Sequence, residues 1–220
     1  MPTNKQASIA IIWTSDLKRY RDRLVFAIAE CAKVLPGIYH VIGIQNVTSP
    51  NTSADALIRQ AVYMDENLGW VIKPVSAVRI LSETVKADAN KRYDLIIALT
   101  RQKICDLDIC DSMYEFCKDY SGIISLEACE SECEYGSFTA SLLTHVVGRA
   151  LLNDGVSLHC NNSDCAMASP QPDRLGTGMT MDFFASPNHD IFCNECLEKL
   201  RESPFWSEEP PTIVFHTSRI

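Results

Sequence analysis

Four cysteines in the C-terminal third of the chain have the type and spacing of a metal site. Four residues separate Cys160 from Cys165, and two separate Cys193 from Cys196. Zinc takes four soft ligands in a tetrahedron, and each closely spaced pair supplies two of them. The residues at 161–164 are turn formers, as a loop between two ligands requires. Because four thiolates close the coordination shell, we expect one structural zinc here. The alternative is four buried free thiols.

A helix predicted over Ser137–Asn153 lies just before these cysteines. It contains the run THVVGR at positions 144–149, and a loop then leads to His159. With this order of residues the chain resembles the archaemetzincins, a family of small metzincin-like zinc peptidases. Their motif is HExxHxxGxxHC, followed by a cysteine, a methionine and a CxxC pair. The matching positions are His145, Gly148, His159, Cys160, Cys165, Met167, Cys193 and Cys196.

The resemblance implies roles for these positions. In the family three histidines hold a catalytic zinc, the glutamate is the general base, and the methionine forms the Met-turn, here Met167. The four cysteines hold a second, structural zinc. Here Val146 replaces the glutamate, Arg149 replaces the second histidine, and the segment leading to His159 is longer. If the motif is aligned backwards from His159 instead, the helix positions still lack a glutamate and paired histidines.

The two replacements change the expected chemistry. A valine cannot accept the proton of an attacking water, and a guanidinium has no lone pair for a metal. His145 and His159 alone would form only a weak, vestigial site, so we do not expect a second, catalytic zinc. Arg149 could instead replace the charge of the metal and bind an anionic group, such as a carboxylate, in the former cleft. The alternative is an internal salt bridge, for example with Asp154 or with a glutamate between 127 and 134.

Composition limits the function classes. The chain has 220 residues, 46% of them hydrophobic, and a formal net charge of −8. This charge argues against broad binding to nucleic acid or to an anionic membrane. The apolar run at 8–13 is too short for a signal segment, and no segment is long enough to span a bilayer. We therefore expect a cytoplasmic protein whose ten cysteines are reduced.

Two further groups of residues allow alternatives. His189 lies close to Cys193 and is an alternative zinc ligand. The remaining cysteines with loose spacing could form a second metal or redox cluster, but we favour free thiols because no CxxC pair accompanies them. These cysteines are Cys105, Cys110, Cys117, Cys129 and Cys133.

Strands alternate with helices along the chain, which indicates an α/β fold. The resemblance implies a zincin/metzincin-like twisted mixed sheet with packed helices and a small C-terminal subdomain held by zinc. We predict an α/β part over 1–154, a zinc part over 155–203 and an extended tail over 204–220. The predicted strands are 8–13, 38–47, 93–100 and 122–128, and the predicted helices are 16–35, 55–68, 76–89, 111–118, 137–153 and 193–202.

The sequence is compatible with three functions. The first is a pseudopeptidase that keeps its structural zinc and binds a peptide or protein partner. Its peptide-binding strand would be Gly122–Ala128, which we predict to be an edge strand of the sheet. The second is a metallopeptidase with rebuilt ligands: His145, His159 and an acidic residue. The third is a structural subunit of a larger assembly. The apolar residues at 213–215 could add a strand to a partner or to the chain's own sheet.

Overall fold

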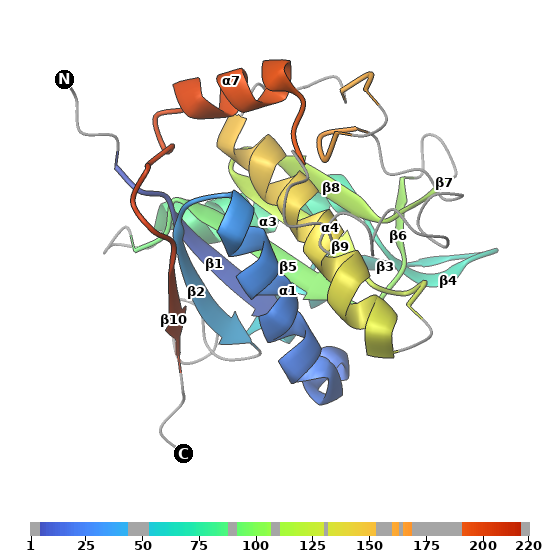
Figure 1. The fold of residues 1–220 in the computed structure, drawn as a ribbon. Coiled ribbons are helices and arrows are strands. Elements are labelled where there is room, and N and C mark those ends of the chain that lie inside the picture. Colours follow the sequence, from blue (N-terminus) through green and yellow to red (C-terminus); the bar gives the residue numbers. More distant parts are fainter. Residues whose placement is uncertain are drawn as a thin grey trace.

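The fold is built on a six-stranded sheet (Figure 1). The computed structural model describes residues 5–43, 53–87, 92–106, 111–129, 132–152, 160–162, 165–168 and 191–216. The strands follow the order β10-β2-β1-β5-β9-β8, and all pair in parallel except β8, which is antiparallel to β9. Their bounds are Ser8–Trp13 (β1), Ile38–Gly43 (β2), Leu95–Thr100 (β5), Glu115–Lys118 (β8), Ser121–Ser125 (β9) and Thr212–Phe215 (β10).

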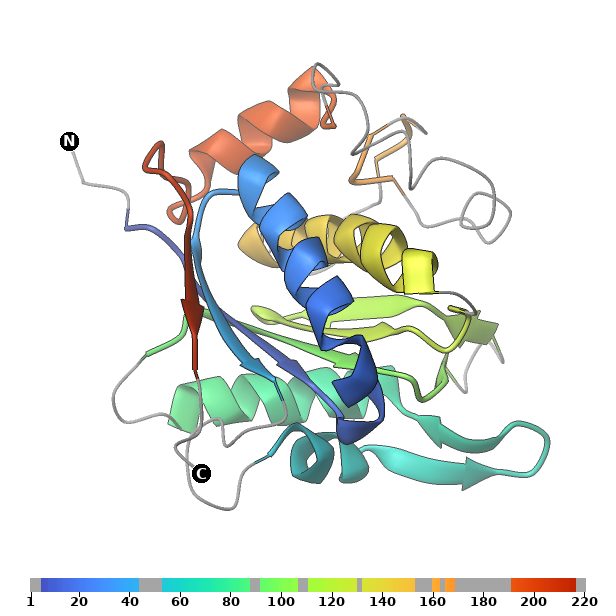
Figure 2. The ribbon, with the colours of Figure 1, turned by 60° about the horizontal axis from the view of Figure 1, so that its bottom comes forward.

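Helices cover both faces of this sheet (Figure 2). Helices α1 (Arg21–Val34) and α4 (Glu132–Leu152) lie on one face, and α2 (Ala54–Arg59) and α3 (Pro74–Ala87) lie on the other. In β1, Ile9 and Ile11 face the first layer, and Ala10 and Ile12 face the second. A strand buried on both faces explains why the sequence of β1 is apolar throughout rather than alternating. A short helix of the 3-10 type, Ser15–Tyr20, joins β1 to α1.

A second, four-stranded sheet lies beyond α2 and α3, with the strand order β3-β4-β6-β7. Its strands are β3 (Val62–Asp65), β4 (Gly69–Ile72), β6 (Ile104–Asp106) and β7 (Asp111–Met113). The predicted helix over 55–68 is therefore wrong after Arg59, because a hairpin follows. Asp65 Oδ1 accepts bonds from the backbone N–H groups of Asn67 and Leu68, and Gly69 adopts a φ of 74°, so these residues form the turn between β3 and β4.

Two other predictions on this side of the molecule are wrong. Residues 111–118 form the strands β7 and β8 and not a short helix, because pairing with β6 and β9 overrides local preference. Strand β9 is not an edge, since it lies between β5 and β8. The edge strand of this part of the sheet is β8.

The remaining elements agree with the α/β prediction. Helix α4 begins at Glu132, earlier than predicted, and α7 spans Asn194–Glu202. The predicted part of strand 38–47 beyond Gly43 lies outside the described residues. The boundary at 154 lies there too, and the division into parts stays a prediction. Side chains from both sides of it, including Val147, Met167 and Leu200, belong to one core.

None of the helices in the described ranges has the combination of length and apolar character that crossing a bilayer requires.

The C-terminal strand β10 extends the chain's own sheet. It pairs in parallel with β2, and the N–H of His216 donates to the carbonyl of Val41 at 3.0 Å. This confirms that the apolar residues 213–215 add a strand to this sheet. The rings of His40 and His216 meet with 2.9 Å between Nδ1 and Nε2, so one of the two nitrogens must donate while the other accepts.

Docking of β10 is expected to weaken in mild acid. Burial lowers the pKa of His40, and the neighbouring His216 and Arg92 lower it further; burial and Arg92 lower the pKa of His216. An unfolded histidine titrates near about pH 6.5, so the unfolded state takes up protons first as the pH falls. The stability that the pair contributes is thus complete above about pH 6.5 and lost as the pH falls toward the lowered pKa values.

Amide hydrogen exchange of Ile213–Phe215 measures this effect. After correction for intrinsic rates, protection should be lower at about pH 5.5 than at about pH 7.5. The variant His216→Asn should show a smaller difference between the two conditions. Equal protection at both pH values in the wild type would contradict the claim that titration of His40 and His216 weakens the docking of β10.

Candidate metal centre

Two short segments bring the four cysteines together. Cys193 precedes the first turn of α7, and Cys196 lies within that turn. The other segment folds back on itself: the N–H of Cys160 donates to the carbonyl of Met167 at 2.9 Å, and the N–H of Cys165 donates to that of Asn162 at 3.1 Å. A bond from the N–H of Ala166 to the carbonyl of Ile191 fastens this loop to the start of α7.

The sulfur positions suit a tetrahedral ion. All four Sγ atoms lie within 4.8 Å of one another, and those of Cys160 and Cys193 are 3.6 Å apart. A tetrahedron with Zn–S bonds of about 2.3 Å has sulfur separations of about 3.8 Å. None of the four cysteines is in a disulfide. The group could therefore hold one metal ion, and its all-thiolate ligands suit zinc.

Backbone N–H groups point at the sulfurs. Asn162 donates to Sγ of Cys160, and both Met167 and Cys193 donate to Sγ of Cys165, each at 3.4 Å. Such bonds favour the thiolate over the thiol. Bonding from the backbone of Cys196 lowers the pKa of Cys193, whereas burial raises the pKa of Cys165 to about 11. A buried thiolate needs a compensating cation, and a bound divalent metal would supply it.

The same loop packs under α4. His145 is 3% exposed, and its Nδ1–H donates to the carbonyl of Ala166 at 2.7 Å. Gly148 leaves room for the thioether of Met167, because a Cβ at position 148 would lie 2.8 Å from the sulfur. The metal centre, Met167 and the helix that carries His145 thus form one packed unit.

A buried charged cluster lies on the other side of His145. Glu115 of β8 is 6% exposed, and its Oε1 lies 3.3 Å from Nη1 of Arg149 and 3.6 Å from Nε2 of His145. Arg149 therefore has an internal carboxylate partner, which agrees with the alternative that it forms an internal salt bridge. The partner that the structure describes is Glu115. Asp154, Glu130 and the side chains of Glu132 and Glu134 lie outside the described residues. The contact of Arg149 with an external anion stays a prediction.

Val146 is fully buried and faces the sheet. A Cβ added to Gly122 of β9 would clash with Cγ1 of Val146, which shows how closely α4 approaches this strand. The side chain at position 146 is packed among apolar groups and offers no acceptor for a proton.

Other predicted site residues fall elsewhere. His159, His189 and Cys110 lie outside the described residues, and nothing is described of the side chain of Cys133. None of Cys105, Cys117 and Cys129 is in a disulfide. Within the described ranges, the quartet of Cys160, Cys165, Cys193 and Cys196 is the only group of three or more potential ligands close enough to hold a metal.

Sequence reasoning missed Glu115. It lies between the uncharged Tyr114 and Phe116 in a segment predicted to be helical, and only its pairing in β8 brings it to α4.

The chain matches no protein-family model, and no curated protein matches it significantly.

Proposed function

We propose that the chain is an archaemetzincin-like protein that keeps a structural zinc, has lost peptidase activity and binds a peptide or protein partner. The observation that carries this proposal is the ion pair between Arg149 and Glu115. A guanidinium stands where the resemblance expects the second histidine, and it is satisfied by an internal carboxylate. A fixed positive charge at this place opposes binding of a second cation.

Loss of the general base supports the same proposal. In a zinc peptidase a carboxylate accepts the proton of the metal-bound water during attack. Val146 occupies that place in the resemblance, and it is buried against β9. Peptide hydrolysis by the usual route therefore has no proton acceptor at this position.

The partner is proposed to bind along β8. The strand Gly122–Ala128 predicted from the sequence contains β9, which already pairs on both sides. Strand β8 pairs only with β9 in the described part of the sheet, so its other side can accept an extended peptide. Because Ser125 N donates to Tyr114 O, the alternation of an antiparallel ladder turns the backbone groups of Glu115 and Cys117 away from β9.

Removal of one backbone donor tests this binding mode. A peptide selected from a random library should bind Cys117→Ala as it binds the wild type, because alanine keeps the N–H. Cys117→Pro removes the N–H that faces away from β9 and should weaken binding by about tenfold or more. Equal affinity of the two variants, with unfolding transitions that show both to be folded, would count against binding along β8.

A second candidate function is a metallopeptidase with rebuilt ligands, and one observation favours it. The N–H at Nδ1 of His145 is fixed by a backbone carbonyl, which leaves Nε2 directed at Glu115, the usual arrangement of a metal-ligating histidine. Glu115 would then be the acidic ligand beside His145 and His159. Zinc-dependent peptide cleavage that is lost in His145→Ala would favour this candidate, and its absence favours the pseudopeptidase.

A further inference from the structure

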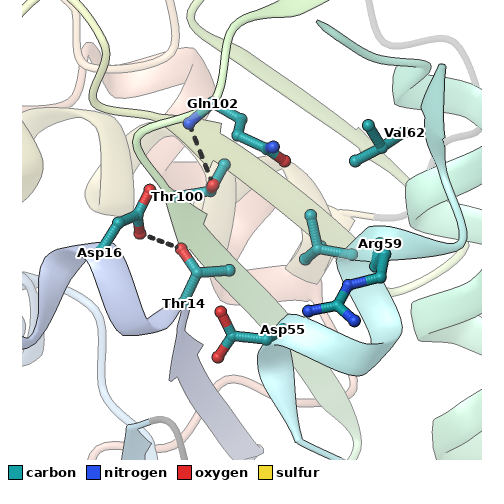
Figure 3. A pocket seen from close by; sticks show the side chains of 8 residues that line it. Thr14, Asp16, Asp55, Arg59, Val62, Thr100 and Gln102 are labelled. Carbon is teal, nitrogen blue, oxygen red and sulfur yellow. Dashed lines mark hydrogen bonds between the residues drawn. The ribbon is translucent and has the colours of Figure 1, made fainter. Parts of the chain in front are cut away.

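A separate pocket lies where β1 and β5 end. Its volume is about 200 Å³, and among the described residues no cysteine and no residue of α4 lines it. The lining residues come from the carboxyl ends of the two strands and from α2 and β3 (Figure 3): Thr14, Asp16, Asp55, Ile58, Arg59, Val62, Thr100 and Gln102.

The topology of the sheet explains why a pocket opens here. Strands β1 and β5 are parallel neighbours. The chain leaves β1 toward α1 on one face of the sheet, and it leaves β5 toward the second sheet, on the face that α2 and α3 cover. Where connections leave two adjacent parallel strands in opposite directions, their carboxyl ends border a crevice, and α/β proteins bind ligands in such crevices.

Two carboxylates are held in place on one side of the pocket. Both oxygens of Asp55 accept from the N–H of Ser15 at 3.1 Å, and Oδ1 also accepts from the Ser15 hydroxyl at 2.8 Å. Asp16 accepts a bond from the hydroxyl of Thr14. These contacts fix the carboxylates without neutralising them, so the side they line favours a cationic group.

Arg59 is exposed and extends from the same helix as Asp55, one turn further along, so its guanidinium lies on the Asp55 side of the pocket, away from Asp16 (Figure 3). The described residues provide no hydrogen bond or ion pair for its guanidinium. Thr100 adds a second donor: it is fully buried, and its hydroxyl oxygen accepts from the N–H of Gln102 at 3.1 Å. The proton of this hydroxyl has no acceptor in the described part of the chain. An exposed guanidinium that pairs with no described carboxylate, and a buried hydroxyl whose proton has no described acceptor, suit a ligand carboxylate.

We propose that this pocket binds a free amino acid with a basic side chain. The carboxylate of the ligand would pair with Arg59 and Thr100. The two ammonium groups of the ligand would pair with Asp16 and Asp55. The pocket lining contains two carboxylates and one guanidinium, so its net charge is negative. This charge favours a ligand that carries two cationic groups over a ligand that carries none. Ile58 and Val62 provide an apolar wall for the methylenes of the side chain. The small volume excludes a dinucleotide, and the two carboxylates disfavour a phosphate.

Calorimetric titration of the full chain with L-lysine, cadaverine and L-glutamate tests this proposal. Lysine should bind saturably. Cadaverine, which lacks the carboxylate, and glutamate, which adds an anion, should bind at least about tenfold more weakly. Arg59→Met and Asp16→Asn should each weaken lysine binding by about tenfold, whereas the control Arg79→Met on the exposed face of α3 should leave it unchanged.

Three outcomes would overturn the proposal: no saturable binding of lysine, affinity that Arg59→Met and Asp16→Asn leave unchanged, or tighter binding of glutamate or inorganic phosphate than of lysine. Zinc content and peptide binding should be the same in Arg59→Met as in the wild type. A failure of this proposal is thus distinguishable from a failure of the proposed function.

Discussion

Replacing Cys193 by serine is expected to remove the bound metal and to destabilise the C-terminal part of the fold. Cys193 supplies one of four sulfurs, and its N–H also donates to Sγ of Cys165. Binding of a structural zinc contributes directly to folding, about 10–16 kcal/mol in zinc-finger peptides, so loss of one thiolate should lower the free energy of unfolding by at least about 3 kcal/mol. Metal analysis and urea denaturation measure the two effects.

Cys117→Ser is the matched control for this variant. Cys117 lies in β8, is in no disulfide and does not belong to the quartet. The control should keep its metal and most of its stability. If Cys193→Ser kept a full complement of metal, or if both variants lost metal equally, the assignment of the site would be wrong.

Replacing Arg149 by leucine is the second change with a large expected effect. It leaves the carboxylate of Glu115 buried without its guanidinium, and removal of one partner of a buried ion pair costs about 3–5 kcal/mol. Because the side chain of Arg149 is 15% exposed, we expect the lower end of this range, about 3 kcal/mol. The free energy of unfolding from urea denaturation gives the value.

A double variant separates the ion pair from general packing. Glu115→Gln in the background of Arg149→Leu removes the buried negative charge and should restore about half or more of the lost stability. Additive losses in the double variant would show that the two side chains do not depend on each other. That result would remove the observation on which the proposed function rests.

The parts of the fold that sequence reasoning predicted are those with strong local signals. Strand β5 is an uninterrupted apolar run, as expected for the centre of a sheet, and α4 has a long apolar sequence. The cysteine pairs are a comparable signal, because metal ligands must recur at short spacing. Each of these features can be recognised within one short window of the sequence.

The errors arise where pairing between distant segments decides the structure. The residues of β8 form a strand because β9 provides a neighbour, and nothing local distinguishes them from a helix. The same pairing brings Glu115 to Arg149, a contact over a separation of 34 positions that spacing rules cannot reveal. The polar pocket follows from the order of strands β1 and β5, which the sequence does not state.

X-ray absorption at the zinc edge of the purified chain tests the central claim most directly. The account predicts a first shell of sulfur alone at about 2.3 Å, from one zinc held by Cys160, Cys165, Cys193 and Cys196. A mixed shell with nitrogen or oxygen at about 2.0 Å, together with two zinc ions per chain, would mean that histidine or carboxylate ligands, such as His145 and Glu115, bind a second zinc. That result would contradict the pseudopeptidase proposal, and the absence of any zinc signal would contradict the metal centre itself.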